Sequence, residues 1–385
     1  MQNQEQNVCS CWPLSSHYFL YFSLLGTILP YLALYLSSLE FSPIEIGQLM
    51  AVFMLTKIIA PNIWGVLADR NQRPIFWVRV ATFAALVLSI GLWFFEGFWS
   101  ILAVLLCFSF FWHASLPQFE SYTFKRLAHE KHRYGQIRLW GSLGFIFAVL
   151  MFGALFEYAG VQILPWVLSA ILLGVWGSTY LVHDQTMGGH SHAAAVRFIT
   201  LLKRPEVIGL LIASFLIQVS HGVYYSFFTI QMTELGMSKT LIAWLWALGV
   251  MAEIAVFWWM ARLFQLFSVR YLLLFAIVLT VLRWLLTGYF AEVLWMIVFA
   301  QLLHAASFGM FHAGAIYLID RYFSGAHHGK GQALFAASSH GLGGALGMLI
   351  AGYSWQYGGA PLSYSLMAIF ALLAGLMIWR FVQKY

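Results

Sequence analysis

Charged residues are scarce in this chain of 385 residues. Asp, Glu, Lys and Arg together make up 9% of it, whereas soluble domains carry about 25%. Hydrophobic residues make up 62%, which is more apolar surface than a water-soluble core can hide. The composition therefore excludes a soluble globular protein and predicts an integral membrane protein.

Cysteine is also rare, and the three residues Cys9, Cys11 and Cys107 make no disulfide framework. The Cys9–Cys11 pair is too short for a zinc site without further ligands. The chain lacks the Gly-x-x-x-x-Gly-Lys stretch that binds ATP and the His-Glu-x-x-His stretch of metalloproteases. We therefore expect no metal, no cofactor and no enzymatic activity, and we exclude ATP as an energy source.

Clusters of basic residues are missing as well. The net charge is +6, but the Lys and Arg residues are scattered between apolar runs, so no nucleic-acid partner is expected. The first residues, MQNQEQNVCSCWP, lack the basic region of a signal peptide. The first apolar run is therefore expected to remain in the protein as a membrane helix.

Long apolar runs dominate the chain, and twelve of them are long enough to cross a bilayer as helices. Their length and the absence of a two-residue alternation exclude membrane strands. The predicted helices lie near residues 15–39, 43–68, 74–95, 98–127, 135–157, 162–183, 206–233, 238–264, 268–290, 292–320, 329–356 and 360–383.

The loops between these runs differ in basic residues. If the N-terminus is cytoplasmic, Lys239 is the one basic residue in the predicted outer loops. Lys57, Arg79, Arg138 and Arg283 lie within helices, and every other Lys and Arg falls on the inner side. The positive-inside rule thus predicts that both termini are cytoplasmic.

One polar interval, residues 183 to 205, separates two sets of six runs. Identical residues recur between the two sets at a constant offset of 196 positions. The pairs are Gly26 and Gly222, Ser42 and Ser238, Ile46 and Ile242, Leu49 and Leu245, Ala51 and Ala247, Gly135 and Gly331, Gln136 and Gln332, and Ser142 and Ser338. We infer two parallel six-helix repeats, residues 1–183 and 206–385, joined by a cytoplasmic loop at 184–205, with a substrate site between them.

Lys57 interrupts the second run, within QLMAVFMLTKIIAPNIWGVLADR (48–70). It lies roughly 20 Å along a helix that begins near Pro43, which is close to the middle of the hydrocarbon core. A lone ammonium costs at least ~2.5 kcal/mol there, so Lys57 needs a partner or a ligand. The offset of 196 places Glu253 at the equivalent position of the eighth run. Both helices are expected to turn a polar face toward the interior of the protein. This face either lines the substrate pathway or forms an ion pair with a neighbouring helix.

Several motifs carry a resemblance to a known family. GVLADRNQR (65–73) resembles the major facilitator superfamily signature Gly-x-x-x-Asp-Arg-x-Gly-Arg, with Gln72 where glycine is usual. YGQIRLWGSLGF (134–145), SHGVYYSFF (220–228), LWALGVMAEI (245–254), LRW (282–284) and LLHAASFGMFHA (302–313) resemble the phenylpropionate permeases. The resemblance implies the major facilitator fold and a proton-coupled permease of the bacterial inner membrane for a small aromatic carboxylate. A related branch carries nucleosides.

The GVLADR stretch also has a physical interpretation. Asp69 ends its helix, where the helix dipole disfavours an anion, so another helix N-terminus or Arg73 is expected to hold it. Gly65 lies four residues earlier and is expected to let a partner backbone approach. Gly65, Asp69, Arg70 and Arg73 are thus predicted gating residues, unless the stretch is only a polar turn.

Three further charges lie within helices. Glu120 of the fourth run and Arg138 of the fifth lie at similar depth, and neither tolerates hydrocarbon alone. We favour a structural ion pair between them over a proton-carrying role for Glu120. Arg283 lies in the ninth run, which is peripheral in this superfamily, and is interpreted as structural.

Four histidines lie at membrane depth, namely His221, His304, His312 and His340. A lone buried histidine is most often a neutral core residue, but histidine also changes charge near neutral pH. The seventh and tenth helices face the cavity in this superfamily, so His221, His304 and His312 become candidates for substrate binding. Tyr224 and Tyr225 suit an aromatic substrate, although aromatic residues make up 18% of the chain.

These observations predict an all-α membrane protein of twelve helices in two pseudo-symmetric bundles. It is expected to act as a monomeric secondary transporter that imports an organic anion, such as 3-phenylpropionate, together with protons. Lys57 is the predicted cation for the substrate carboxylate, and Glu253, with His221, His312 or Glu120, carries the coupling proton. Two alternatives are a nucleoside or sugar proton symporter and a membrane sensor that transports nothing.

Overall fold

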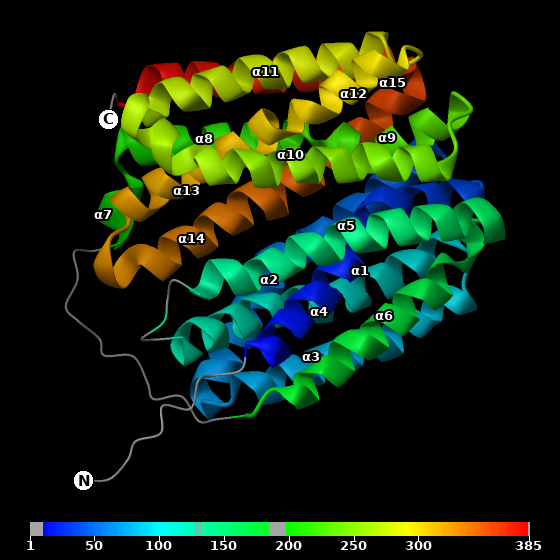
Figure 1. The fold of residues 1–385 in the computed structure, drawn as a ribbon, viewed down its shortest axis with the longest axis horizontal. Helices are drawn as coiled ribbons and strands as arrows, with labels where there is room; N and C mark the ends of the chain where they lie inside the picture. Colours follow the sequence, from blue (N-terminus) through cyan, green and yellow to red (C-terminus); the bar gives the residue numbers. More distant parts are fainter. Residues whose placement is uncertain (1–10, 128–129, 131–132, 185–197, 384–385) are drawn as a thin grey trace.

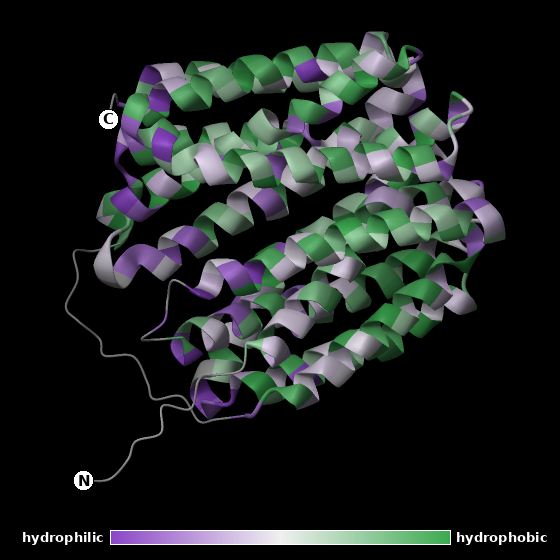
Figure 2. Ribbon diagram, in the orientation of Figure 1, coloured by the Kyte–Doolittle hydropathy of each residue, from purple (hydrophilic) through white to green (hydrophobic). Residues whose placement is uncertain are grey.

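The computed structural model describes residues 11–127, 130, 133–184 and 198–383, and all regular structure in that part is helical. Figure 1 shows the helices running roughly parallel, with α1–α6 on one side and α8–α15 on the other. We call the end where α1 begins and α15 ends the terminal face, and the other end the opposite face. Hydrophobic residues predominate along the helices, and hydrophilic ones gather toward the two ends (Figure 2).

The first half of the chain supplies six membrane-length helices. They are α1 (Trp12–Ser38), α2 (Pro43–Asn71), α3 (Pro74–Ser89) with the 3-10 turn η1 (Ile90–Trp93), α4 (Phe98–Arg126), α5 (Tyr134–Ala159), and α6 (Leu164–Ser178) between the 3-10 turns η3 (Val161–Ile163) and η4 (Thr179–Leu181). The start of α2 shows why the ends of these helices can be predicted from the sequence. Ser42 and Glu45 form a capping box, and Pro43 occupies the first helical turn, where it costs no hydrogen bond.

The second half supplies six more spans, and three of them are built from several pieces. They are α8 (Pro205–Ser220) with α9 (Gly222–Glu234); α10 (Lys239–Leu266); α11 (Val269–Tyr289); α12 (Leu294–Leu302) with η5 (Ala305–Met310) and α13 (Phe311–Tyr322); α14 (His328–Ala336) with η7 (Ala337–Gly343) and the first part of α15 (Gly344–Phe381); and the rest of α15. Short segments α7 (Phe198–Leu202) and η6 (Gly325–His327) lie at the terminal face. Gly359, with φ 57° and ψ −155°, divides α15 into two spans. The predicted twelve-helix fold is thus confirmed in the described residues.

Three spans of the second half are interrupted at corresponding depth. The seventh breaks at His221, between α8 and α9. The tenth and eleventh each contain a π-helical segment, η5 and η7. Such segments often occur at functional sites, because the extra residue re-aims the side chains around it. All three breaks border the sites described below.

The two halves repeat the same helix crossing. A Cβ on Gly144 would lie 2.1 Å from the carbonyl oxygen of Phe19, so α5 touches the backbone of α1. A Cβ on Gly343 would lie 2.8 Å from the carbonyl oxygen of Phe215, so η7 touches α8 in the same way. Phe215 follows Phe19 by the 196 positions of the sequence repeat. Small residues permit such close crossings in membrane helices, and each half has one between its first and fifth spans, although Gly343 lies 199 residues after Gly144.

The halves contact each other closely toward the opposite face. A Cβ on Gly47 of α2 would lie 2.7 Å from the Cα of Gly352 in α15. A Cβ on Gly153 of α5 would lie 2.4 Å from the Cβ of Ala243 in α10. Both pairs lie near the ends of their helices at the opposite face. The two halves are therefore packed closely against each other through small residues on this side of the molecule.

Gln72 shows a local strain that the sequence motif explains. It follows α2 with φ 52°, the left-handed region that favours glycine, and glycine is the residue usual at this position of the signature. We expect Gln72→Gly to raise the free energy of unfolding by about 1 kcal/mol, since the left-handed conformation costs a residue with a Cβ about that much. Thermal unfolding in detergent measures the effect. Gln72→Ala keeps the Cβ and should bring no gain, and a loss of stability in the glycine variant would contradict this explanation.

Candidate functional site

A cavity of about 170 Å³ lies between the two halves of the chain. Its wall comes from α1, α5, α9, α10, η5 and the residue that precedes η5, and we call it the central cavity. The lining residues are Phe22, Leu25, Leu29, Arg138, Ser142, Phe145, Tyr224, Tyr225, Trp246, Val250, Glu253, His304 and Phe308. Arg138 and Glu253 are the two charged members of this wall, and they come from different halves.

Glu253 belongs to a chain of polar contacts. Its Oε2 lies 3.6 Å from His304 Nε2. His304 Nδ1 lies 2.9 Å from the NH1 group of Arg283. A guanidinium can only donate, so Nδ1 must be the acceptor and the proton of neutral His304 lies on Nε2, toward Glu253. Arg283 is thus linked to the Glu253 carboxylate through one imidazole ring.

Arg283 is fully buried, with no exposed surface. Besides His304 it donates to Ser307 Oγ at 2.9 Å and to Gln301 Oε1 at 3.3 Å, and its guanidinium lies 4.2 Å from the centre of the Tyr224 ring. Arg283 was interpreted as structural, and its place in a network that reaches Glu253 was not foreseen from the sequence. The run around it is hydrophobic on all sides, and such a run has no apolar stripe from which its inward face can be read.

Aromatic side chains form the wall of the central cavity in the second half. Tyr224 lies 4.4 Å from Trp246, centre to centre, and Tyr225 stacks on Trp246 at 6.4 Å. The Tyr224 hydroxyl donates to Gln301 Oε1 at 2.9 Å, so its ring is fixed in place. The predicted substrate residues Tyr224, Tyr225 and His304 thus share one cavity, while Trp246 and Gln301 were not predicted.

Arg138 and Glu120 lie together, as the sequence suggested, with Arg138 Nε 3.9 Å from Glu120 Oε1. Tyr134 donates to the same carboxylate oxygen at 3.5 Å. The guanidinium of Arg138 lies 3.9 Å from the centre of the Phe22 ring, in the wall of the central cavity. Arg138 therefore belongs both to an ion pair and to the wall of the cavity, and its gating or structural role stays a prediction.

The other predicted ligands lie outside this wall. His221 is fully buried and donates from Nδ1 to the carbonyl oxygen of Ile217 at 2.8 Å. His312 and His340 line a separate polar cavity of about 10 Å³ with Ser214, Ser307 and Ser339, among others. Lys57 is half-buried on α2 and does not line the central cavity. Lys57, His221 and His312 thus lie outside the wall that carries Glu253, although the charges of His312 and Glu253 still act on each other.

The predicted gate lies at the terminal face. Arg70 and Arg73 are exposed, and Arg73 directly precedes α3. A Cβ on Gly65 would meet Gln118 Nε2 at 3.6 Å, which is ordinary contact. The expected close approach of a partner backbone to Gly65 was therefore wrong, because this position has room for a methyl group. The side chain of Asp69 lies outside the described part of the structure.

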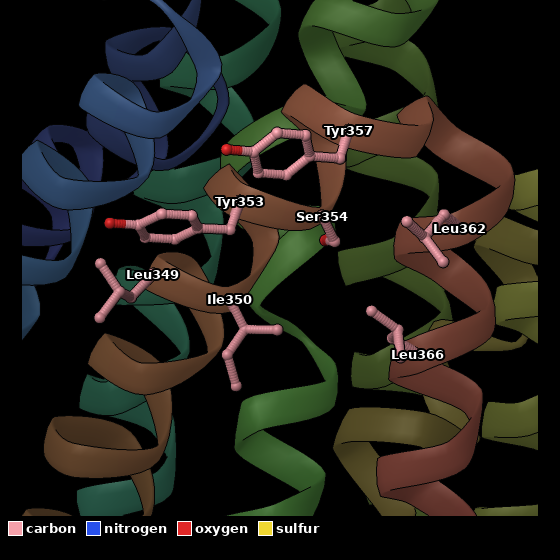
Figure 3. Close-up of a pocket in the computed structure, with 7 residues that line it drawn as sticks. All are labelled: Leu349, Ile350, Tyr353, Ser354, Tyr357, Leu362 and Leu366. Atoms are coloured by element: carbon pink, nitrogen blue, oxygen red, sulfur yellow. The ribbon is translucent and has the colours of Figure 1, made fainter.

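A second groove is larger than the central cavity, but its lining offers no charged group for a substrate or a proton. Figure 3 shows a groove of about 400 Å³ between two stretches of α15, with Leu362 and Leu366 on one side and Leu349, Ile350, Tyr353 and Tyr357 on the other. Its lining contains no charged residue. Apolar grooves on the outside of a membrane protein face lipid, so the groove is not our candidate site.

Twelve helices in two pseudo-symmetric bundles, with a cavity between them that holds charges, define a secondary transporter of the major facilitator type. The model of the MFS_1 like family matches residues 11–366, and the chain belongs to this family. It is 27% identical over 369 residues to the probable 3-phenylpropionic acid transporter of Escherichia coli (strain K12), covering 94% of this chain and 95% of that one. It is 28% identical to the maltose permease of Geobacillus stearothermophilus, covering 94% and 92%. The crystal structure of the nucleoside transporter NupG superposes with a TM-score of 0.83 at 16% identity, covering 97% and 99%.

Proposed function

We propose that this transporter is a proton-coupled symporter that imports a small aromatic carboxylate, such as 3-phenylpropionate. Residues 1–183 and 206–385 are the two moving units, and 184–205 links them. The observation that carries the proposal is the central cavity, where Arg138 and Glu253 face one space between aromatic walls. The similarity to the probable 3-phenylpropionic acid transporter supports the same substrate class.

Arg138 is suited to the substrate carboxylate. A guanidinium binds a carboxylate through two parallel hydrogen bonds, and its charge here rests on the Phe22 ring. The aromatic ring of the substrate then packs on Tyr225 and Trp246, where ring contacts add to the area buried. Lys57 remains a candidate ligand for the anion, although it lies outside the wall of the central cavity.

Glu253 is suited to the coupling proton. Burial disfavours the charged form of a carboxyl group, so Glu253 takes up a proton when the cavity is dry. When the proton leaves, the carboxylate faces the Nε2–H of His304, which is backed by the charge of Arg283. Glu120, His221 and His312 are the other groups able to carry the proton.

The close packing at the opposite face supports an assignment of sides. Basic residues gather on the terminal face. By the positive-inside rule this face is cytoplasmic, so both termini lie in the cytoplasm and the protein spans the bacterial inner membrane. The contacts at Gly47 and Gly153 close the outer side. On this proposal the protein works as a monomer, and its substrate leaves toward the cytoplasm.

Arg138→Gln tests the carboxylate ligand. We expect the dissociation constant for 3-phenylpropionate to rise roughly 10- to 100-fold, since a hydrogen bond to a charged group contributes about 1.5–3 kcal/mol. Binding is measured with purified protein in detergent by isothermal titration. Arg79→Gln is the matched control, because Arg79 donates to the carbonyl oxygens of Thr179 and Val182, away from the cavity. Equal affinity in the parent and in Arg138→Gln would exclude Arg138 as the ligand.

A nucleoside or sugar proton symporter is the second candidate. The cavity wall carries one Arg and one Glu, and this balance of charge suits a neutral ligand. The similarity to a maltose permease and to a nucleoside transporter also favours this candidate. Proteoliposomes with an imposed pH gradient distinguish the candidates. Uptake of labelled 3-phenylpropionate supports the first, uptake of maltose or uridine supports the second, and uptake of none of them by folded protein supports a sensor.

A further inference from the structure

The ammonium group of Lys57 has no anionic partner. Among the residues that the structure describes, no hydrogen bond or ion pair to it is present, and no carboxylate acts on it electrostatically. Its side chain is half-buried on α2, near the middle of the span. A lone ammonium costs at least ~2.5 kcal/mol at such a depth. An anion that is not part of the protein would remove this cost.

A second basic group lies beside Lys57 in the same half. His113 of α4 is 5% exposed, and its Nδ1 lies 2.8 Å from the hydroxyl of Thr56, the residue before Lys57. The other nitrogen, Nε2, is buried and has no hydrogen-bond partner in the structure. Buried polar atoms are nearly always paired, so this nitrogen indicates a missing ligand or water.

A third basic group comes from the other half. A Cβ on Gly341 would lie 2.7 Å from Cγ1 of Ile58, so η7 touches α2 next to Lys57. The neighbouring residue, His340, is partly exposed, and the charge of Lys57 acts on both His340 and His113. The π-helical turn thus places His340 near the segment of α2 that carries Lys57, where the two halves meet.

We propose that Lys57, His113 and His340, the basic cluster, form a binding site for a small monovalent anion between the two halves of the transporter. The site is separate from the central cavity, whose wall contains none of the three. An ammonium group and two imidazole N–H donors supply the contacts that a halide or a carboxylate accepts. The anion is either chloride or the carboxylate of the substrate, and only the second source rests on the proposed function. Since α2 and α4 supply one side and η7 the other, binding is coupled to the approach of the two halves.

The test measures anion-dependent thermal unfolding of the purified full-length protein in detergent at constant ionic strength. Chloride, and separately 3-phenylpropionate, is titrated against gluconate as the reference anion. We expect a saturable rise in the unfolding temperature with at least one of the two anions. Lys57→Gln should weaken that dissociation constant roughly 10- to 100-fold, because it removes the charged donor. His113→Asn and His340→Asn should each weaken it less, since asparagine keeps a polar group at the Nδ1 position and lacks Nε2.

Arg79→Gln is the matched control, because it removes a cation of the same half that is bound to the carbonyl oxygens of Thr179 and Val182, and it should leave the anion effect intact. A chloride effect that is lost in Lys57→Gln establishes a halide site whether or not the protein transports an aromatic acid. A 3-phenylpropionate effect that is lost in Lys57→Gln but kept in Arg138→Gln assigns the cluster to the substrate carboxylate. Stabilisation by neither anion, or stabilisation that survives in Lys57→Gln, overturns the proposal.

Discussion

Glu253→Gln should abolish accumulation of substrate against a gradient while the variant still exchanges labelled substrate across the membrane. Glutamine keeps the shape of the side chain and a hydrogen-bonding group toward His304, but it fixes the neutral form. The exchange steps need only the protonated state, whereas net uptake requires that the proton leave. Counterflow and pH-gradient-driven uptake, measured on the same proteoliposomes, separate the two activities.

The control for this experiment is Glu234→Gln, which changes a carboxylate at the end of α9, outside the central cavity. It should accumulate substrate as the parent does. If Glu253→Gln also concentrates substrate in response to the pH gradient, Glu253 is not the coupling residue. The role then passes to Glu120, His221 or His312.

Gly47→Leu should hold the transporter open toward the opposite face. A Cβ at this position would lie 2.7 Å from the Cα of Gly352 and 2.8 Å from the carbonyl oxygen of Met348, and neither backbone atom can yield without parting the helices. Overpacking of this kind costs about 1–3 kcal/mol or more. We therefore expect the population sealed at the opposite face, and the transport rate with it, to fall roughly 10- to 100-fold.

The state of the Gly47→Leu variant is read from a single cysteine at Leu29, which lines the central cavity, in a protein whose three native cysteines are replaced. A membrane-impermeant thiol reagent added at the opposite face should label it faster than in the parent. Gly177→Leu is the control, because nothing lies within 4 Å of a Cβ there. Unchanged labelling and unchanged transport in Gly47→Leu would show that the α2–α15 contact does not seal this face.

The sequence predicted the spans well because their ends carry strong local signals. Ser42 and Pro43 start α2, Pro74 starts α3 and Pro205 starts α8, and each of these is visible without any tertiary contact. The depth of Lys57 followed from helix rise, and that of Glu253 from the repeat offset of 196 positions. These features depend on position along one helix, which a sequence records directly.

What the sequence did not show is which way each helix faces. Arg283, Gln301 and Ser307 form one buried network, yet each lies in a run that is apolar on every side. The charge of Arg283 within the LRW motif was the available signal, and the expectation that its helix is peripheral outweighed it. The π-helical segments η5 and η7 were also missed, because they arise from packing against other helices and not from local propensity. They decide that His304 reaches the central cavity while His312 and His340 line another one.

The network around Arg283 also constrains how the chain is assembled during synthesis. Helix α11 enters the bilayer before the following span, which carries Gln301, His304 and Ser307, has left the ribosome. Before that span arrives, the partner of Arg283 that is already in the membrane is Tyr224, which lies on an earlier span. An uncompensated arginine at such a depth costs about 2.5–3.5 kcal/mol by insertion scales. These bonds to Arg283 can therefore form only when the α12–α13 span packs against α11, so the stability of the second half depends on the two spans together.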